Sequence, residues 1–402
     1  MKNILIYGAG GNCEVFLHDV VNKNFNVLAI IDKNKCGSEF EGITIESPDK
    51  IQDYKYDEIY ITPRENENIV ETLVNIYNVP KNNIKLPEDI NNEYIIPKID
   101  DYANVIIASK IDKNSCFAFV FKKLLENTNT AFIRLLDCKN SIHIDKISYK
   151  KKLFIFISYS LVNIKSNGFF ENLILAYPNS KKFLWLCDPF EDPLYGVPQM
   201  VREFDSVENL KKTFDYCYTY HIQDAKKYNF LFYPQFFPNI NVNEYADDKR
   251  YDVFFIGNVK KRKQLIYEVY DKLISIGLKC QFLLFNVPKE ERIDNGIVYT
   301  DIYINYSEIL KEIAKSKCIL EVCNNGDETS FRFAEAVVFN KKLLINDDSV
   351  RERMYYNENN MKIYHSADDV KADWFLEETE NYNYKGEYDT EYYLKNVLQI
   401  LL

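Results

Sequence analysis

Residues 251–262 read YDVFFIGNVKKR, and this stretch governs how the last part of the chain folds. Its first six residues form a continuous apolar run, which is typical of a parallel strand buried on both faces. The run stops at Gly257, and Lys260, Lys261 and Arg262 open a segment of helical periodicity. Cations in a first helical turn oppose the helix dipole unless an anion binds there. The stretch therefore predicts a strand, a turn and a helix that begins at an anion site. A solvated basic helix face is the alternative interpretation.

A second junction of strand and helix carries a related set of residues. The apolar strand expected at 318–322 precedes Ser330, whose hydroxyl can cap the helix expected at 330–339. Arg332, in the first turn, can bring a fork of donors to a phosphate, and Glu335 lies one turn further on the same side. A capped helix with an internal ion pair is the alternative. Both junctions follow strand C-termini, where open α/β sheets bind their ligands.

Strands alternating with helices fill the rest of the chain, so the sequence predicts an α/β fold of three Rossmann-like units. We expect the units at residues 1–97, 98–240 and 250–402, with a polar hinge at 239–250. The amphipathic pattern at 389–402 predicts a last helix that crosses back to the middle unit. The last two units should then be tied together across the hinge.

The first unit opens with a glycine turn between a strand and a helix. Gly8, Gly10 and Gly11 would let the backbone approach a pyrophosphate, and Asp32 follows the next strand, where a ribose-binding carboxylate is expected. Cys13 stands where the full dinucleotide fingerprint has a third glycine. The pattern predicts a nucleotide-binding unit. A fold of this type that binds nothing, or that serves as a docking module, is the alternative.

The composition excludes several classes of protein. The 402 residues include 50 Lys and Arg against 60 Asp and Glu, and this net charge of −10 argues against a nucleic-acid partner. The nine cysteines form no C-x-x-C pair and the four histidines are scattered, so we expect reduced thiols and no metal site. No apolar run reaches the roughly 18 residues that a membrane-spanning helix needs. We therefore expect a cytoplasmic protein.

Residues 100–402 resemble the two-domain glycosyltransferases of the GT-B type, in particular those of bacterial lipopolysaccharide and capsule synthesis. The resemblance rests on the strand–Gly–x–x–Lys–x–Arg segment at 251–262, the S/T-x-R-x-x-E-A helix at 330–336 and the stretch at 214–237. It implies two Rossmann-like domains around a cleft. It also implies that a nucleotide-sugar serves as the donor substrate, with no separate cofactor. Residues 1–97 resemble the small N-terminal domain of bacterial sugar-modifying and capsule-assembly proteins, which in some relatives holds a nucleotide-sugar.

The resemblance also implies roles for single residues at the donor end. The donor-binding residues that it implies are Gly257, Asn258, Lys260, Arg262, Ser330, Arg332 and Glu335. Lys260 and Arg262 would neutralise the donor diphosphate, Ser330 and Arg332 would hold the same group, and Glu335 would bind the ribose. The chain departs from many relatives at residues 327–329, where Asp-Glu-Thr replaces an uncharged stretch.

Candidates for a catalytic base lie in the middle unit. An inverting transferase needs a base that takes the proton from the acceptor hydroxyl, and Asp188 and Asp192 follow the strand expected at 183–187. His221 and His143 are rivals, because a histidine can accept a proton near neutral pH. A loop carboxylate that merely shapes a turn is the alternative.

The sequence as a whole predicts a metal-independent glycosyltransferase for surface polysaccharide or glycoconjugate assembly. Its partners would be a nucleotide-sugar donor and a glycan, lipid-linked or protein acceptor. Two other functions stay open: an NAD-dependent oxidoreductase that uses the first glycine turn, and a non-catalytic assembly factor that binds a nucleotide-sugar. The sequence selects no particular sugar, nucleobase, acceptor or anomeric outcome. It also leaves open peripheral contact with a membrane and the oligomeric state.

Overall fold

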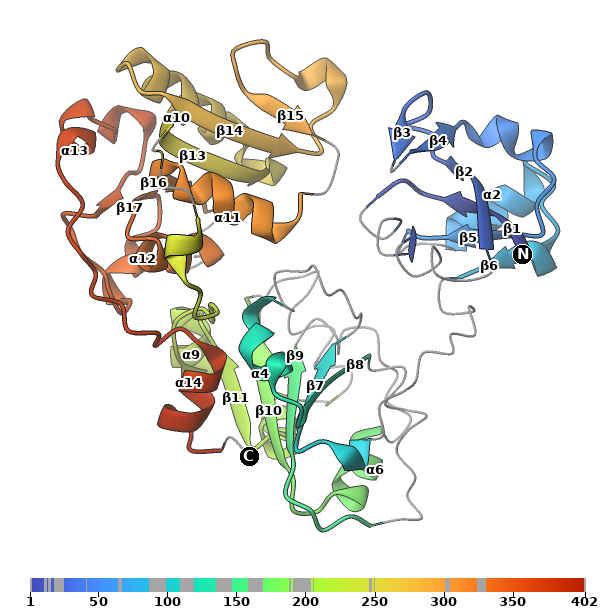
Figure 1. Ribbon diagram of the computed structural model, residues 1–402, viewed down its shortest axis with the longest axis horizontal. Coiled ribbons are helices and arrows are strands. Elements are labelled where there is room, and N and C mark those ends of the chain that lie inside the picture. Colours follow the sequence, from blue (N-terminus) through green and yellow to red (C-terminus); the bar gives the residue numbers. More distant parts are fainter. Residues whose placement is uncertain are drawn as a thin grey trace. The chain divides into compact units, whose positions relative to one another are not determined.

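The protein is described from a computed structural model, in which the chain divides into two compact units, Met1–Ile95 and Ile96–Leu402 (Figure 1). The residues that the structure describes are 2–10, 13, 16–17, 25–40, 42–63, 67–86, 99–108, 119–134, 147–157, 169–187, 189–190, 204, 206–245, 248, 250–300, 304–323 and 330–400. Three six-stranded sheets, flanked by helices, form an α/β fold. One sheet belongs to the first unit and two belong to the second.

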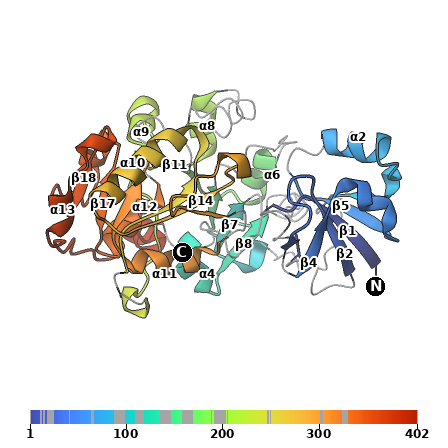
Figure 2. The same ribbon diagram turned by 90° about the horizontal axis from the view of Figure 1, so that it is seen from above.

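The sheet of the first unit has the strand order β3-β4-β2-β1-β5-β6, of which Figure 2 labels β4, β2, β1 and β5. Its elements are β1 (Lys2–Tyr7), β2 (Phe25–Ile31), β3 (Glu39–Phe40), β4 (Ile43–Glu46), β5 (Glu58–Ile61), α2 (Glu67–Asn75) and β6 (Ile84–Lys85). Neighbouring strands run parallel except β3 and β4. Ile4, Leu5 and Ile6 of the central strand are all buried, since successive side chains enter the cores on opposite faces of the sheet. Burial on both faces explains why this strand is continuously apolar.

The second unit begins with the middle sheet, of strand order β12-β11-β10-β9-β7-β8, with all its strands parallel. Its elements are β7 (Asn104–Ala108), α4 (Lys122–Glu126), β8 (Thr130–Arg134), β9 (Leu153–Ile157), α6 (Phe169–Ala176), β10 (Lys181–Leu186), α8 (Val207–Thr213), β11 (Tyr216–Thr219), α9 (Ile222–Tyr228) and β12 (Leu231–Phe232). The strand order reverses between β7 and β9. The segments that follow these two strands, 109–118 and 158–168, lie outside the described residues.

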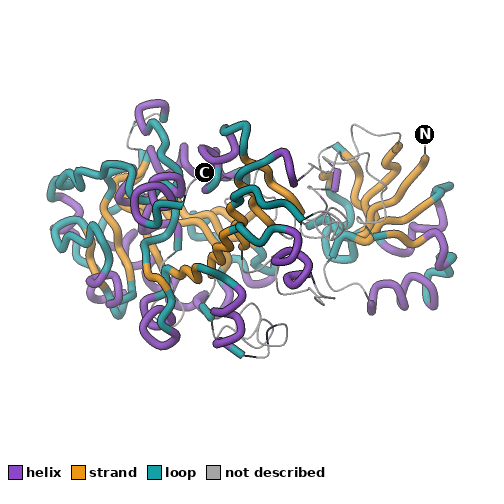
Figure 3. The backbone as a smooth tube through the Cα atoms, turned by 90° about the horizontal axis from the view of Figure 1, so that it is seen from below, coloured by secondary structure: helices purple, strands orange, loops and turns teal. Residues whose placement is uncertain are grey.

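The C-terminal sheet has the order β15-β14-β13-β16-β17-β18, again with all strands parallel. Its elements are β13 (Tyr251–Asn258), α10 (Lys263–Ser275), β14 (Cys280–Phe285), β15 (Val298–Thr300), α11 (Tyr306–Ala314), β16 (Ser316–Glu321), α12 (Phe331–Val338), β17 (Lys342–Ile345), β18 (Met361–Ile363) and α13 (Ala372–Leu376). Helices pack on both faces of the strands, as Figure 3 shows in purple and orange.

The apolar run of β13 is explained by two different cores. Val253 and Phe255 pack in the cluster that contains the α10 side chains. Phe254 and Ile256 pack in the cluster that contains α11 and α12, on the other face of the sheet (Figure 1). Alternate residues of a strand point to opposite faces, so a central strand covered by helices on both sides must be apolar throughout.

The last described residues of the chain pack on the middle sheet. Asp389 caps α14 (Thr390–Tyr392), and a π-helical turn, Tyr393–Val397, follows it. Tyr393 and Leu394 are buried in the core around β9 and β10. The described helical structure ends at Val397, before the helix expected at 389–402 is complete. None of the helices in the described part of the chain has the length and apolar character that a membrane crossing requires.

Candidate functional site

The C-terminal sheet splits at its carboxyl edge between two neighbouring strands. β13 pairs with β14 as far as Asn258 and Phe285, whereas its pairing with β16 ends at Phe254 and Ile319. The chain continues from β13 to β14 and β15 on one side and later adds β16, β17 and β18 on the other. This is the point at which the strand order reverses, and open α/β sheets bind ligands in the crevice at that point.

Two arginines bond to backbone carbonyls on the two sides of the split. Arg262 donates from Nη2 to the Asn258 carbonyl at 2.7 Å and from Nη1 to the Val322 carbonyl. Arg332 donates from Nη2 to the carbonyl of Ile256. Carbonyl groups that are shielded from water need hydrogen-bond donors. The two guanidinium groups supply donors where hydrogen bonding between β13 and β16 has ended. They come from the helical segments that follow β13 and β16, which places both sequence-predicted arginines at one split.

Ser330 caps α12 as the sequence predicts. Its hydroxyl, however, donates a hydrogen bond to Glu321, which is not among the sequence-predicted site residues. Ser330 Oγ accepts the backbone N–H of Arg332 at 3.3 Å and lies 3.4 Å from Arg332 Nη1. The hydroxyl itself donates to the carboxylate of Glu321, which also accepts the Ser330 N–H at 3.3 Å. Glu321 ends β16 and is only 3% exposed. An acidic residue at the end of an apolar strand is the signal that selected Asp32, and it could have selected Glu321.

Glu335 lies beside this group and is 1% exposed. The hydroxyl of Tyr306 donates to Glu335 Oε1 at 2.6 Å. Burial raises the pKa of the Glu335 carboxyl, while Arg332 and the Tyr306 hydrogen bond act in the opposite direction. The nearby charge of Glu321 also raises this pKa. Glu335, Glu321 and Arg332 therefore form one electrostatically linked group at the split.

The remaining predicted donor residues lie on the first junction. Gly257 does not adopt a positive φ, and an added Cβ would lie 3.5 Å from Arg262 Nη2, which is ordinary contact. Asn258 Oδ1 accepts from Asn286 Nδ2 at 3.0 Å. Lys260 opens a 3-10 turn, Lys260–Arg262, and α10 begins only at Lys263. The sequence placed three cations in the first turn of an α-helix, whereas the structure puts them before it.

The candidate bases of the middle sheet are only partly described. His221 precedes α9 at the carboxyl edge of β11, is 3% exposed, and packs against Tyr220 with ring centroids 4.3 Å apart and the rings tilted by 36°. The Tyr220 hydroxyl donates to the Cys187 carbonyl at 2.5 Å, and Arg353 Nη1 donates to the Tyr220 carbonyl at 2.9 Å. The other candidates, Asp188, Asp192 and His143, lie outside the described residues.

The glycine turn of the first unit sits where its sheet reverses strand order, between β1 and β5. Gly8 has a φ of +96°, and an added Cβ would lie 2.7 Å from the Pro63 ring, so this turn requires glycine. Asp32 accepts the Ala9 N–H at 2.8 Å on Oδ2 and two further backbone N–H groups on Oδ1. The carboxylate that the sequence predicts as a ribose partner therefore holds the glycine turn through the Ala9 N–H. Gly10 has open space around it, and Gly11 lies outside the described residues.

Cys13 follows this turn and is fully buried in the core of the first unit. At the position of the missing third glycine, the thiol side chain packs against apolar neighbours. In the described part of the chain, no group of three or more His, Cys, Asp and Glu side chains is placed to hold a metal ion.

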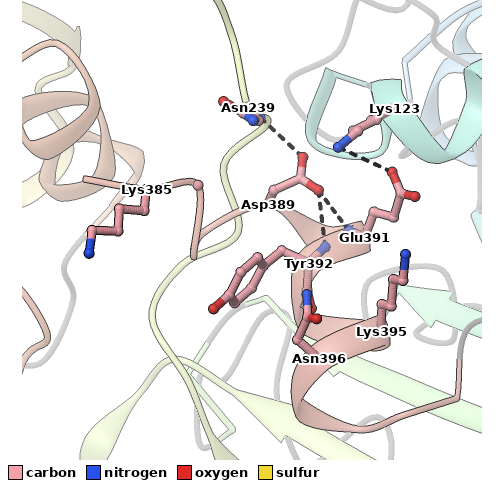
Figure 4. Close-up of a pocket in the computed structure, with 9 residues that line it drawn as sticks. Lys123, Asn239, Lys385, Asp389, Glu391, Tyr392, Lys395 and Asn396 are labelled. Carbon is pink, nitrogen blue, oxygen red and sulfur yellow. Dashed lines mark hydrogen bonds and ion pairs between the residues drawn. The ribbon is translucent and has the colours of Figure 1, made fainter. Parts of the chain in front are cut away.

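A polar pocket of about 170 Å³ lies elsewhere in the second unit, where residues 385–396 meet α4 (Figure 4). Its lining residues are Lys123, Asn239, Lys385, Gly386, Asp389, Glu391, Tyr392, Lys395 and Asn396. Figure 4 shows Asp389 at its centre, bonded to Asn239 and to the first turn of α14. None of the sequence-predicted site residues lines this pocket.

Comparisons with known proteins give two kinds of similarity. Residues 1–85 match the family described as C2185-like, N-terminal, and no curated protein matches the chain. Among solved structures, a trehalose-6-phosphate synthase is 10% identical, covers 67% of this chain and 89% of its own, and has a TM-score of 0.45. An α,α-trehalose-phosphate synthase (UDP-forming) of Burkholderia vietnamiensis is 9% identical over 74% and 93%, with a TM-score of 0.44. An α-glucosyltransferase solved with UDP and a 13-mer DNA is 11% identical over 65% and 82%, with a TM-score of 0.41.

Proposed function

We propose that this chain is a glycosyltransferase of the GT-B type, which binds the diphosphate of a nucleotide-sugar at the split between β13 and β16. One observation carries the proposal: two guanidinium groups from separate helical segments meet at this split. Arg332 reaches back to the end of β13, and Arg262 reaches across to the end of β16. Guanidinium groups match the oxygens of a phosphate better than any other side chain does.

The arrangement suits the chemistry of glycosyl transfer. Negative charge develops on the leaving diphosphate as the bond to the sugar breaks. Cationic donors that are already fixed in place stabilise this charge without reorganising during the reaction. The carbonyls of Ile256, Asn258 and Val322 fix the two arginines in this way. Because arginines supply the positive charge, we propose a metal-independent reaction, with Lys260 as a further cation.

Glu335 is the proposed partner of the ribose, because a carboxylate can accept hydrogen bonds from two neighbouring hydroxyls. Its carboxylate is buried and already accepts the Tyr306 hydroxyl, so the ribose must displace or share that contact. The acceptor would bind at the carboxyl edge of the middle sheet, with His221, Asp188 or Asp192 as the base. The acceptor classes are a glycan, a lipid-linked saccharide or a protein in surface-polysaccharide or glycoconjugate assembly.

The experiment is a saturation-transfer NMR and calorimetric titration of the full chain with UDP, ADP, GDP, dTDP, CMP, the corresponding nucleotide-sugars, and NAD. We expect one nucleotide-sugar and its nucleotide to bind, and Arg332→Ala to weaken that binding by about 10-fold to 100-fold, as the loss of charge-assisted hydrogen bonds predicts. Asp252→Asn is the matched control, because Asp252 lies at the opposite end of β13 and pairs with Lys317.

Three results would contradict the proposal. Tight binding of NAD with no response to any nucleotide-sugar would favour an oxidoreductase that uses the Gly8 turn. Binding of a nucleotide-sugar that Arg332→Ala leaves unchanged, in a variant that still unfolds cooperatively, would place the donor away from the split. A nucleotide-sugar bound tightly and never turned over with any acceptor would favour the non-catalytic assembly factor.

A further inference from the structure

Glu321 is a buried carboxylate at the edge of the split. It is the last residue of β16 and is 3% exposed. Both the N–H and the O–H of Ser330 donate to its Oε2 atom. A buried carboxylate is stable only where hydrogen bonds and positive charge compensate its lost hydration. Ser330 supplies two hydrogen bonds here, and Arg332 in turn donates from Nη1 to the Ser330 hydroxyl.

The direction of the Ser330 hydrogen bond decides what this hydroxyl can do. A serine hydroxyl has one proton and two lone pairs, and an ionised carboxylate can only accept. Because the Ser330 O–H donates to Glu321, the lone pairs of Ser330 Oγ are left to accept hydrogen bonds from Arg332. The Arg332 backbone N–H lies 3.3 Å from Oγ and its Nη1 lies 3.4 Å away. Ser330 is thus an acceptor that holds Arg332, whereas the sequence suggested a donor to phosphate.

The same contact fixes the start of α12 to the sheet. Glu321 and Ser330 are nine residues apart, at the two ends of the connection from β16 to α12. On the β16 side, Asn346 accepts the Cys323 N–H at 2.6 Å and donates to its carbonyl at 3.0 Å. Arg332 is then held at a second point by the carbonyl of Ile256. The guanidinium is therefore oriented from both strands of the split.

We propose that Glu321 is a positioning residue of the donor site. Because Glu321 accepts the hydrogen bond of the Ser330 hydroxyl, the serine oxygen serves as the acceptor that orients the Arg332 guanidinium toward the donor diphosphate. The orientation of Arg332 follows from the contacts of Ser330 with Glu321 and Arg332, and its consequence for the donor rests on the proposed function. Glu321 itself touches neither diphosphate nor sugar, and it acts through Ser330 and Arg332.

The first test needs no ligand. Side-chain ¹⁵N NMR of arginine-labelled full-length protein reports how fast each guanidinium rotates, and Arg332→Lys assigns the Arg332 signals. We expect slow rotation of the Arg332 guanidinium in the parent protein and at least about tenfold faster rotation in Glu321→Ala, because one of its two anchors is lost. Glu321→Gln keeps an acceptor oxygen and should restore much of the order. Asp252→Asn, which removes a carboxylate at the other end of the sheet, should leave the Arg332 signals unchanged.

The second test is a double-mutant cycle on nucleotide affinity, using the nucleotide that the parent protein binds. We expect Glu321→Ala and Ser330→Ala each to weaken binding about tenfold, and the double variant to be no weaker than either single one. Additive losses would overturn the proposal, because they would mean that Glu321 acts independently of Ser330. Unchanged Arg332 rotation in Glu321→Ala would also overturn it. If the parent protein binds no nucleotide, the proposed function fails, and the rotation measurement still decides whether Glu321 orients Arg332.

Discussion

The hydroxyl of Tyr306 lies 2.6 Å from Oε1 of Glu335 and donates a hydrogen bond to it, although the two residues are 29 positions apart. The Tyr306 ring also packs against Phe119 of the middle part, with centroids 5.1 Å apart, and against Phe331 at 6.0 Å. The Tyr306 side chain thus contacts both Glu335, the residue proposed to bind the ribose, and the part of the chain that would bind the acceptor. Tyr306 therefore connects Glu335 to Phe119 by direct contacts.

Removing this hydroxyl should change how the protein responds to pH. Burial raises the pKa of Glu335 and the Tyr306 hydrogen bond lowers it, so Tyr306→Phe should raise it further. A carboxyl group whose pKa is raised by folding stabilises the protein fully at pH values below its ordinary pKa near 4.3. This stabilisation is lost as the pH rises through the pKa of the folded state. We expect the loss of stability with rising pH to extend to higher pH in Tyr306→Phe, and to disappear in Glu335→Gln.

The measurement is urea unfolding of the full chain at several pH values between about 4 and 8. At neutral pH, Tyr306→Phe should cost about 1.5–3 kcal/mol, the usual value of a hydrogen bond to a charged group. Nucleotide binding that needs an ionised Glu335 should shift to higher pH in the same variant. Identical pH profiles for the parent, Tyr306→Phe and Glu335→Gln would show that Glu335 does not titrate in this range.

Arg262 should matter for stability more than the neighbouring lysines do. Its guanidinium bridges the carbonyl of Asn258 at the end of β13 and that of Val322 just after β16, and the ammonium group of a lysine cannot span the same pair. We expect Arg262→Lys to cost about 1–2 kcal/mol and Arg262→Ala about 2–4 kcal/mol, because carbonyls in the split lose their donors. Lys261→Ala is the control: its side chain is exposed, and its effect should stay within about 0.5 kcal/mol. Equal effects at both positions, measured by chemical unfolding, would mean that Arg262 does not bridge the split.

The first unit offers a matched pair of glycines. Gly8 has a φ of +96° and lies against Pro63, so Gly8→Ala combines a strained backbone with a steric clash. Gly10 has no heavy atom within 4 Å of an added Cβ and does not have a positive φ. We expect Gly8→Ala to destabilise the first unit by about 2–4 kcal/mol and Gly10→Ala by less than about 1 kcal/mol. Thermal unfolding followed by circular dichroism measures both, and a Gly8→Ala variant as stable as the parent would rule out the strained turn.

Local sequence patterns predicted the parts of the fold that depend on local physics. The apolar run of β13 predicted a strand covered on both faces, and Ser330 before an amphipathic segment predicted a helix cap. Both are present. The three-residue strands β15 and β18 were not predicted, because each lies at a sheet edge and is too short to show a periodic pattern.

The contacts that give each site residue its partner could not be predicted, because they join distant parts of the chain. Arg332 bonds to a carbonyl 76 positions away, and Arg262 bonds to one 60 positions away. Periodicity and capping rules act over a few residues and contain no information about such pairs. The same limit hid Glu321 and Tyr306, whose importance comes from the residues that they contact. It also hid the role of Asp32, whose carboxylate holds the turn of Ala9.

Asp389 should be the most sensitive position of the segment that returns to the middle sheet. Its buried carboxylate accepts the N–H of Asn239 at 3.1 Å and those of Glu391 and Tyr392 at 3.0 and 3.1 Å (Figure 4). It therefore caps α14 and also ties the segment to the chain leaving the middle sheet. Asp389→Ala leaves three partly buried N–H groups without their acceptor, which we expect to cost about 2–4 kcal/mol. Asp389→Asn keeps one acceptor oxygen and should recover about half of that loss.

Glu391→Ala is the control for this prediction, because Glu391 pairs with Lys123 at 3.4 Å across a partly exposed surface (Figure 4). Surface ion pairs contribute little, so this variant should lose less than about 1 kcal/mol. Native-state hydrogen exchange adds a local readout. If Asp389 anchors the segment, Asp389→Ala should raise the exchange rates of residues 390–397 far more than those of the C-terminal sheet, because Tyr393 and Leu394 would leave the middle core more often. Uniform acceleration over the whole second unit would instead mean that the segment unfolds only together with both sheets.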